Sequence, residues 1–171
     1  MRVAVLSDTH LPRFGRVLPG PLVRALEVER VERILHAGDW TAPFVVELLE
    51  SIAPVHGVAG NNDPPELAAR LGTVRVVELD GVLVGLTHGH LGSARLATPA
   101  RAAASLAHVP GLAAVCFGHS HIPLVRASPD GGPLLVNPGS PTDKRRQPRF
   151  SWALLEVGGG AVEAELRFLD R

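Results

Sequence analysis

The chain has 171 residues, of which 46% are hydrophobic, and this is enough to bury the core of one domain. Its 17 basic and 17 acidic side chains give a formal net charge of zero, so no overall charge favours a nucleic-acid backbone or an anionic membrane. The single cysteine, Cys116, excludes an intrachain disulfide scaffold and favours a reducing compartment. No apolar run approaches the roughly 18 residues of a membrane span, and the first residues do not resemble a signal peptide. We therefore expect a cytoplasmic protein.

The first sixty residues alternate between apolar strands and amphipathic helices. Continuous apolar runs predict strands that are buried on both faces, whereas apolar side chains on one face predict helices. In chain order the expected elements are a strand at 2–7, a loop at 11–20, a helix at 21–31, a strand at 33–37, a helix at 43–52 and a strand at 54–59. This order is typical of parallel strand–helix–strand units.

The remainder of the chain is richer in strands that tight turns connect. Asp80-Gly81 is a favourable type I′ pair, and turns are also expected at 129–132 and 158–160. In chain order we expect strands at 73–79 and 82–87, a helix over the Ala-rich residues 93–108, and strands at 112–117, 122–127, 133–136, 151–157 and 161–168. Together these elements predict an α/β fold.

Side chains that can bind a metal follow five of the expected strands. In strand order they are Asp8 and His10, Asp39, Asn61, His88 and His90, and His119 and His121. Ligands of open α/β sheets bind beyond the carboxyl ends of the strands. Residues two apart in an extended segment point the same way, which predicts that Asp8 and His10 converge and that His119 and His121 do so too. Metal coordination would remove the cost of burying these groups beside apolar strands.

Five motifs in this order resemble those of the calcineurin-like metallophosphoesterases. They are DTH at 8–10, GD at 38–39, GNND at 60–63, HGH at 88–90 and GHSH at 118–121. NPGSP at 137–141 is also similar to the small members of that superfamily, the YfcE-type phosphodiesterases of bacteria and archaea. The resemblance covers residues 2–141 and implies one metallophosphoesterase domain over 1–171, folded as a four-layer α/β/β/α sandwich.

The resemblance also implies a dinuclear metal site in which Asp39 bridges two ions. The first ion would be held by Asp8, His10, Asp39 and His121, and the second by Asp39, Asn61, His88 and His119. A bridging water or hydroxide would attack the phosphorus. His90 would then lie near the substrate, and Asp63 would orient its neighbours. The resemblance favours Mn²⁺, while the nitrogen and oxygen donors leave Fe, Ni²⁺ and Zn²⁺ open.

Asn62 departs from the pattern of the superfamily. Many members have a histidine after the motif asparagine, and that histidine is proposed to protonate the leaving group. An asparagine cannot act as a general acid, and losing such an acid costs on the order of 10²–10⁴ in rate for poor leaving groups. His90 or a metal-bound water could replace it. We therefore expect a preference for substrates with good leaving groups.

The function expected from these observations is hydrolysis of a small phosphodiester with two divalent metal ions. The alternatives are a phosphomonoesterase acting on nucleotides or phosphoproteins, and a non-catalytic scaffold, because a retromer subunit shares this fold and works by binding partners. Long nucleic acid is not expected as a substrate, and a homo-oligomer remains open. The basic residues at 143–149 form either a solvated loop or a rim that steers an anionic substrate.

Overall fold

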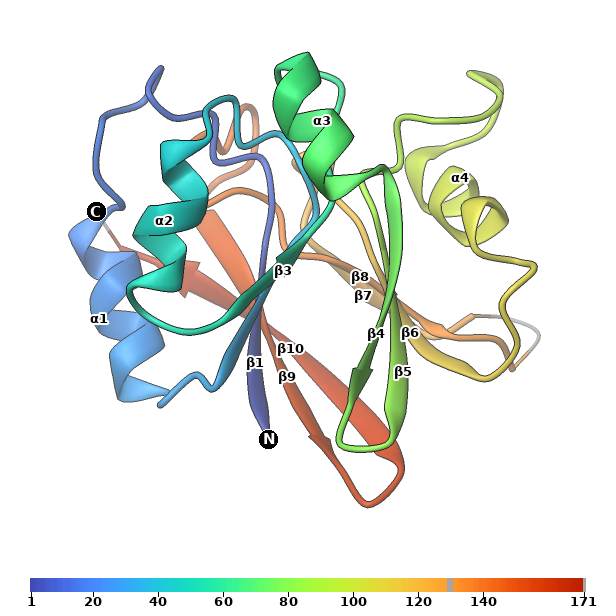
Figure 1. Cartoon of the computed structure of the whole chain (residues 1–171). Coiled ribbons are helices and arrows are strands. Elements are labelled where there is room, and N and C mark those ends of the chain that lie inside the picture. The colour runs from blue at the N-terminus through green and yellow to red at the C-terminus, as the bar shows by residue number, and fades with distance from the viewer. Residues whose placement is uncertain (129–130, 171) are drawn as a thin grey trace.

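Two five-stranded sheets face each other in the computed structural model, which describes residues 1–128 and 131–170 (Figure 1). The first sheet has the strand order β10-β9-β1-β2-β3. It consists of β1 (Arg2–Leu6), β2 (Arg33–His36), β3 (Val55–Gly57), β9 (Phe150–Gly158) and β10 (Ala161–Leu169). β1, β2 and β3 are parallel, and the β9–β10 hairpin pairs antiparallel with β1.

The second sheet has the strand order β4-β5-β6-β8-β7. It consists of β4 (Val74–Leu79), β5 (Val82–Thr87), β6 (Leu112–Cys116), β7 (Leu124–Arg126) and β8 (Leu134–Asn137). β5, β6 and β8 are parallel, and the edge strands β4 and β7 are antiparallel to their neighbours. The β4–β5 connection is the predicted type I′ turn, because Asp80 and Gly81 both have positive φ, at 50° and 77°. Pro129 and Asp130, in the expected turn at 129–132, lie outside the described residues.

Helices cover the outer faces of the two sheets. The described residues form α1 (Gly20–Val28), α2 (Phe44–Glu50), α3 (Pro65–Leu71) and α4 (Thr98–Ser105). α1 and α2 lie on the first sheet and α4 on the second, whereas α3 stands at the top of Figure 1 between the two halves. No helix in the described part of the chain combines the length and apolar character needed to cross a membrane.

Three apolar clusters fill the spaces between these layers. Alternate residues of β1 show the arrangement: Ala4 and Leu6 pack in the cluster beneath α1 and α2, while Val3 and Val5 pack between the two sheets. A third cluster lies between α4 and the second sheet. Both faces of β1 are therefore buried, which explains its continuous apolar sequence. The predicted four-layer α/β/β/α sandwich is confirmed.

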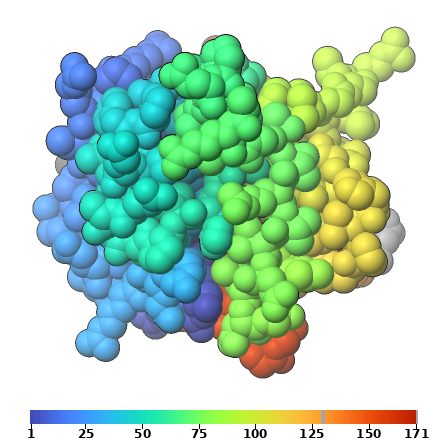
Figure 2. All heavy atoms as spheres, viewed as in Figure 1, coloured from blue at the N-terminus to red at the C-terminus, as the bar shows by residue number. Residues whose placement is uncertain are grey.

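Two helices differ from the sequence prediction. α3 was not among the expected elements, although proline at the start of a helix and Gly72 after its end are typical helix boundaries. α4 is shorter than the predicted helix over 93–108. Pro99 lies in its first turn, where its missing N–H costs nothing, so residues 93–97 form a loop instead. This segment projects from the body just before α4 in Figure 2.

Candidate metal centre

The loops that follow β1, β2, β3, β5 and β6 meet at one end of the two sheets, at the top of Figure 1. Backbone hydrogen bonds connect these loops directly. Asp8 N donates to Gly38 O at 2.9 Å, and Gly118 N donates to His88 O at 3.2 Å. All the motif residues that the sequence singled out therefore belong to one region of the molecule.

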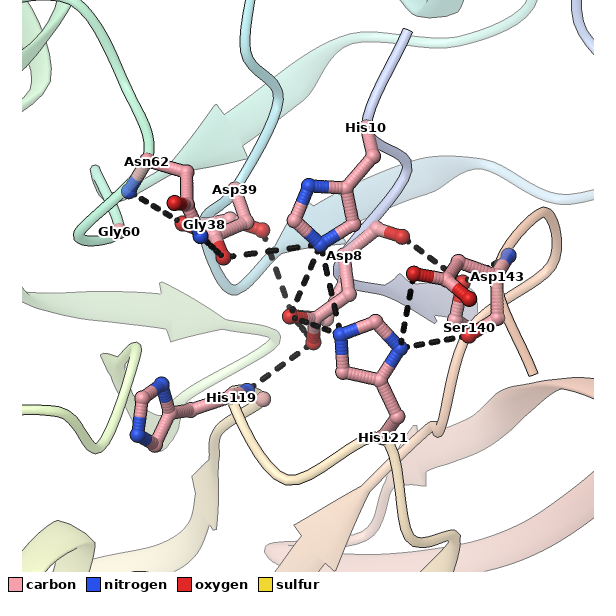
Figure 3. A network of polar contacts seen from close by, with 12 residues as sticks. Asp8, His10, Gly38, Asp39, Gly60, Asn62, His119, His121, Ser140 and Asp143 are labelled. Carbon is pink, nitrogen blue, oxygen red and sulfur yellow. Dashed lines mark hydrogen bonds and ion pairs between the residues drawn. The ribbon is translucent and has the colours of Figure 1, made fainter. Parts of the chain in front are cut away.

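Asp8, His10 and His121 form the first group of metal-competent side chains (Figure 3). His121 Nε2 lies 3.2 Å from Asp8 Oδ1, and His10 Nε2 lies 3.7 Å from the same oxygen. The two imidazoles stack with their Nε2 atoms 3.3 Å apart. All three side chains are buried.

Asp8, Asp39 and His88 form a second such group. His88 Nε2 lies 3.3 Å from Asp39 Oδ2, and His10 Nε2 lies 3.6 Å from that same oxygen. Asp8 belongs to both groups, and Asp39 contacts one histidine of each. The two carboxylates thus lie between three imidazoles from three different loops, an arrangement suited to two neighbouring cations.

His119 and Asn61 lie on the His88 side of the centre. His119 Nδ1 is 3.0 Å from Asn61 Oδ1, and its ring meets the His88 ring edge-on at a centroid distance of 5.2 Å. In Figure 3 the His119 ring turns away from His121. This differs from the expectation that His119 and His121 aim at one point.

The backbone explains that difference. Five of the predicted ligands have left-handed φ angles: Asp8 at 54°, His10 at 46°, Asp39 at 60°, His119 at 69° and His121 at 58°. The alternation argument assumed an extended chain, and these residues are not extended. Non-glycine residues rarely adopt this conformation, which costs on the order of 1 kcal/mol or more at each position. Several left-handed non-glycine residues in one region are typical of a functional site.

Glycines in the motifs allow these loops to approach each other. A Cβ added at Gly60 would collide with the Asp39 carboxylate and lie 2.6 Å from the Asp39 backbone nitrogen. A Cβ added at Gly118 would collide with Ser7 Oγ and lie 2.6 Å from Asp8 Oδ2. Any side chain at either position would push the ligand loops apart.

Hydrogen bonds fix the tautomers of two central histidines. His88 Nδ1 donates to Ala37 O at 2.7 Å, and His121 Nδ1 donates to Asp143 O at 2.5 Å. A carbonyl only accepts, so Nδ1 carries the proton in each neutral ring and the lone pair of Nε2 faces the carboxylates. Within residues 1–128 and 131–170, the buried atoms Asp8 Oδ1 and His88 Nε2 have no hydrogen-bond partner. Buried atoms that lack hydrogen-bond partners and point toward one place are suited to be ligands of bound metal ions.

The carboxylates of the centre are held ionised. Burial alone would raise the pKa of Asp8, but contacts with His10 and His121 and the charge of His88 hold it far below its usual value. Burial opposes the shift at Asp39 as well, where His88 and Asn62 lower the pKa to about 2. Conversely, burial would lower the pKa of His88 and His121, yet Asp39 and Asp8 raise it. The aspartates thus favour a proton on these two imidazoles in the metal-free centre, and a bound cation would compete with that proton.

Asn62 and Asp63 contact the Asp39 loop in different ways. Asn62 donates to the Asp39 carboxylate from its backbone nitrogen at 2.9 Å and from Nδ2 at 2.6 Å. Asp63 accepts from the backbone nitrogens of Asp39 at 3.0 Å, Thr41 at 2.7 Å and Gly60 at 2.7 Å. Burial raises the pKa of Asp63, and these N–H donors oppose that rise. Asp63 thus connects the turn after β2 to the turn after β3 through hydrogen bonds.

His90 lies beside His88 and His119. Its ring centroid is 5.3 Å from that of His88 and 6.3 Å from that of His119. Its carbonyl accepts from Arg101 Nη1 at 3.2 Å, and its Nδ1 is buried without a hydrogen-bond partner in the described part of the chain. Burial and the neighbouring charge of His88 lower the pKa of His90. A neutral imidazole therefore faces the centre here.

Several positioning residues were missed in the sequence. Ser7 Oγ donates to Asp8 Oδ2 at 2.7 Å, and Ser140 Oγ donates to Asp8 O at 2.7 Å. Thr142 Oγ1 donates to Thr9 O at 2.6 Å. Asn137, in the NPGSP motif, donates from Nδ2 to Gly118 O at 3.0 Å. The NPGSP segment and its neighbours thereby brace the loops that carry Asp8 and His119.

Two layered sheets with buried carboxylates and imidazoles at the strand ends define an α/β/β/α protein with a candidate metal centre. The profile of the calcineurin-like phosphoesterase superfamily domain matches residues 1–160, and the chain belongs to this superfamily. The resemblance found in the motifs is thus confirmed.

Curated relatives and solved structures agree with this assignment. A probable metallophosphoesterase of Methanothermobacter thermautotrophicus is 34% identical over 169 residues, which cover 97% of this chain and 91% of the relative. A phosphodiesterase of Methanocaldococcus jannaschii is 27% identical over 154 residues, covering 81% of this chain and 83% of the relative. The crystal structure of Vps29 from Chaetomium thermophilum has the same fold, with a TM-score of 0.74, 21% identity, and coverage of 99% of this chain and 95% of that one.

Proposed function

We propose that the protein is a phosphodiesterase that works with two divalent metal ions. The observation that carries the proposal is the convergence of Asp8, Asp39, His10, His88 and His121, with buried Asp8 Oδ1 and His88 Nε2 lacking hydrogen-bond partners among the described residues. The phosphodiesterase named among the relatives supports the diester preference. The single, buried Cys116 suits a reducing, cytoplasmic location.

The proposed ligand sets divide the centre in two. Asp8, His10, Asp39 and His121 would hold one ion, and Asp39, Asn61, His88 and His119 the other. When bound, two divalent cations supply the Lewis acidity that lowers the pKa of a water and polarises the phosphoryl oxygens. Mn²⁺ is our first choice, and Fe, Ni²⁺ and Zn²⁺ suit the same donors.

The residues of the chain prepare the centre for a phosphodiester. Asp8 and Asp39 are ionised at neutral pH, and the hydrogen bonds of His88 and His121 aim their Nε2 lone pairs inward. Two divalent ions would bring four positive charges and the two aspartates would return two negative ones, so a singly charged phosphodiester meets a net positive centre. Asp63 holds the Asp39 turn in place through its three backbone contacts.

The protonation of the leaving group distinguishes this chain within its superfamily. The Asn62 amide donates a hydrogen bond to Asp39 and is far too weak an acid to protonate a leaving group. His90, beside His88, is a side chain near the centre that could serve as the acid, but its pKa is lowered. We therefore propose that good leaving groups such as aryl oxides are preferred, because they depart without protonation.

Two other functions remain as candidates. A phosphomonoesterase would use the same ligands, and the likeness of fold to Vps29 keeps a non-catalytic scaffold open. The deciding experiment reconstitutes metal-free protein with each ion in turn and assays bis(p-nitrophenyl) phosphate against p-nitrophenyl phosphate. We expect faster turnover of the diester with Mn²⁺. Faster turnover of the monoester would favour the phosphomonoesterase, and tight metal binding without turnover of either would favour the scaffold.

A further inference from the structure

We propose that Arg13 and Arg145 form an anion subsite beside the metal centre, which binds a second phosphate carried by one ester arm of the substrate. This inference rests on the proposed function and narrows its substrate class to short phosphodiesters with an additional phosphate. It rests on a cavity, on two guanidinium groups that line it, and on the charge asymmetry of the site.

The cavity opens directly onto the centre and has a volume of about 750 Å³. Its lining residues are His10, Pro12, Arg13, Thr41, Asn62, Asp143 and Arg145. The volume is typical of sites for small organic ligands, roughly 300–1,000 Å³, and far exceeds what one phosphate fills. An ester arm of a phosphodiester held at His10 and Asn62 therefore has room to extend into the cavity that the two arginines line.

Arg145 is aimed by the same turn that orients His121. The backbone carbonyl of Asp143 accepts from His121 Nδ1, while the Asp143 carboxylate accepts from Arg145 N at 3.3 Å and lies 3.9 Å from Arg145 Nε. Arg145 itself has a left-handed φ of 47°, which this carboxylate supports. In the part of the chain that the structure describes, the Nη1 and Nη2 atoms of Arg145 have no ion-pair partner, and they form the edge that binds an oxyanion.

Arg13 provides the second cation. Its guanidinium carbon lies 5.2 Å from the centre of the Phe14 ring, and no carboxylate among the described residues pairs with it. Stacking on a ring leaves the planar guanidinium edge free for hydrogen bonds. Two guanidinium groups on one cavity are the usual means of recognising a phosphate.

The charges favour a second anion in this cavity. The cavity is lined by two arginines and one aspartate, so it keeps a net positive charge next to the metal centre. On the His90 side the corresponding cation, Arg101, is already occupied: Nη1 donates to His90 O and Nη2 to Thr98 Oγ1, each at 3.2 Å. The chain as a whole is neutral, so the attraction acts on a small substrate in the cavity and not on a polyanion at a distance.

The test measures binding to the Mn²⁺-loaded protein by calorimetry, with thymidine 3′,5′-bisphosphate and thymidine 5′-phosphate as probes. The two differ by one phosphate. We expect the bisphosphate to bind about 10-fold more tightly, with this ratio falling about 3-fold in Arg13→Gln and in Arg145→Gln and approaching one in the double variant. Arg146→Gln, the exposed neighbouring arginine that does not line the cavity, is the matched control and should keep the wild-type ratio.

Equal affinity for the two probes, or a ratio that both glutamine variants leave unchanged, would overturn the proposal. An activity arm uses the p-nitrophenyl 5′-esters of the same two nucleotides, which share a leaving group, and the ratio of their kcat/KM values should follow the binding ratio. If neither ester is hydrolysed, the proposed function fails, while the binding ratio still decides whether the subsite exists.

Discussion

Lowering the pH should destabilise the folded protein through one buried histidine, His36, at the end of β2. Its ring is fully buried and stacks on Trp40 at a centroid distance of 3.6 Å. Gly38 N donates to His36 Nδ1 at 3.2 Å, so Nε2 carries the proton and faces Thr9 Oγ1 at 3.3 Å. The ring is therefore neutral in the fold. Burial lowers its pKa to about 3, although the charge of Asp8 opposes this shift.

The sign and size of the effect follow from linkage. Between the unfolded pKa of about 6.5 and the folded value, the unfolded chain binds a proton that the folded chain does not, so stability falls as the pH falls. A pH of about 4.5 is roughly two units below the unfolded pKa, so the free energy of unfolding is about 2.7 kcal/mol smaller there than at about pH 7.5. Such a loss is a large part of the stability of an ordinary domain, about 5–15 kcal/mol.

Urea unfolding of the metal-free protein over this pH range measures the loss. His36→Asn keeps an acceptor for Gly38, and His36→Gln keeps a donor toward Thr9, but neither titrates. Because the other titrating groups are common to all three proteins, we expect the stability difference between wild type and each variant to shrink by about 2.7 kcal/mol as the pH falls. A difference that stays constant to within about 0.5 kcal/mol would refute the assignment of His36 as a neutral buried ring.

Three further predictions concern the centre and its surroundings. Asp63→Asn removes part of the acceptor for three backbone N–H groups, so the variant should bind metal about 10- to 100-fold more weakly in a metal titration. Glu66→Gln, a change at an exposed neighbouring residue, should bind metal as tightly as the wild type. Equal metal affinities of the two variants would contradict the role of Asp63. Asn62→His should raise turnover of alkyl phosphodiesters by about 10²-fold and of p-nitrophenyl esters far less, and equal gains on both would argue against a missing general acid. Burial raises the pKa of Cys116 to about 12, so a thiol reagent should label it only as the protein unfolds, and fast labelling of the native protein would contradict its placement in the core.

The layers were predicted well from the sequence because strands that are buried on both faces consist of continuous apolar residues. Val3 and Val5 face the other sheet while Ala4 and Leu6 face the helices, so the strand reads as an unbroken apolar run. The Asp80-Gly81 turn was equally readable, since only a few residue pairs favour two successive positive φ angles. α3 was missed because its prolines can begin a helix as well as a turn, and local sequence does not decide between the two.

At the site, the sequence predicted which residues gather but not how they face one another. Motif order at strand ends placed Asp8, Asp39 and His88 in one region, because parallel strands end at one edge of a sheet. The left-handed backbone of His119 and His121 separates their rings, and no periodicity argument could show this. Contacts between distant segments, such as His121 with the Asp143 carbonyl, likewise depend on the folded chain.

The most direct test of a shared dinuclear centre follows activity while metal is added to stripped protein. Turnover of bis(p-nitrophenyl) phosphate should appear only as the second Mn²⁺ binds, elemental analysis should give two ions per chain, and the paramagnetic resonance spectrum should be that of a coupled pair. Asp39→Asn should abolish both the coupling and most of the turnover. Full activity with one ion per chain, or activity that survives complete removal of metal, would contradict the proposed centre.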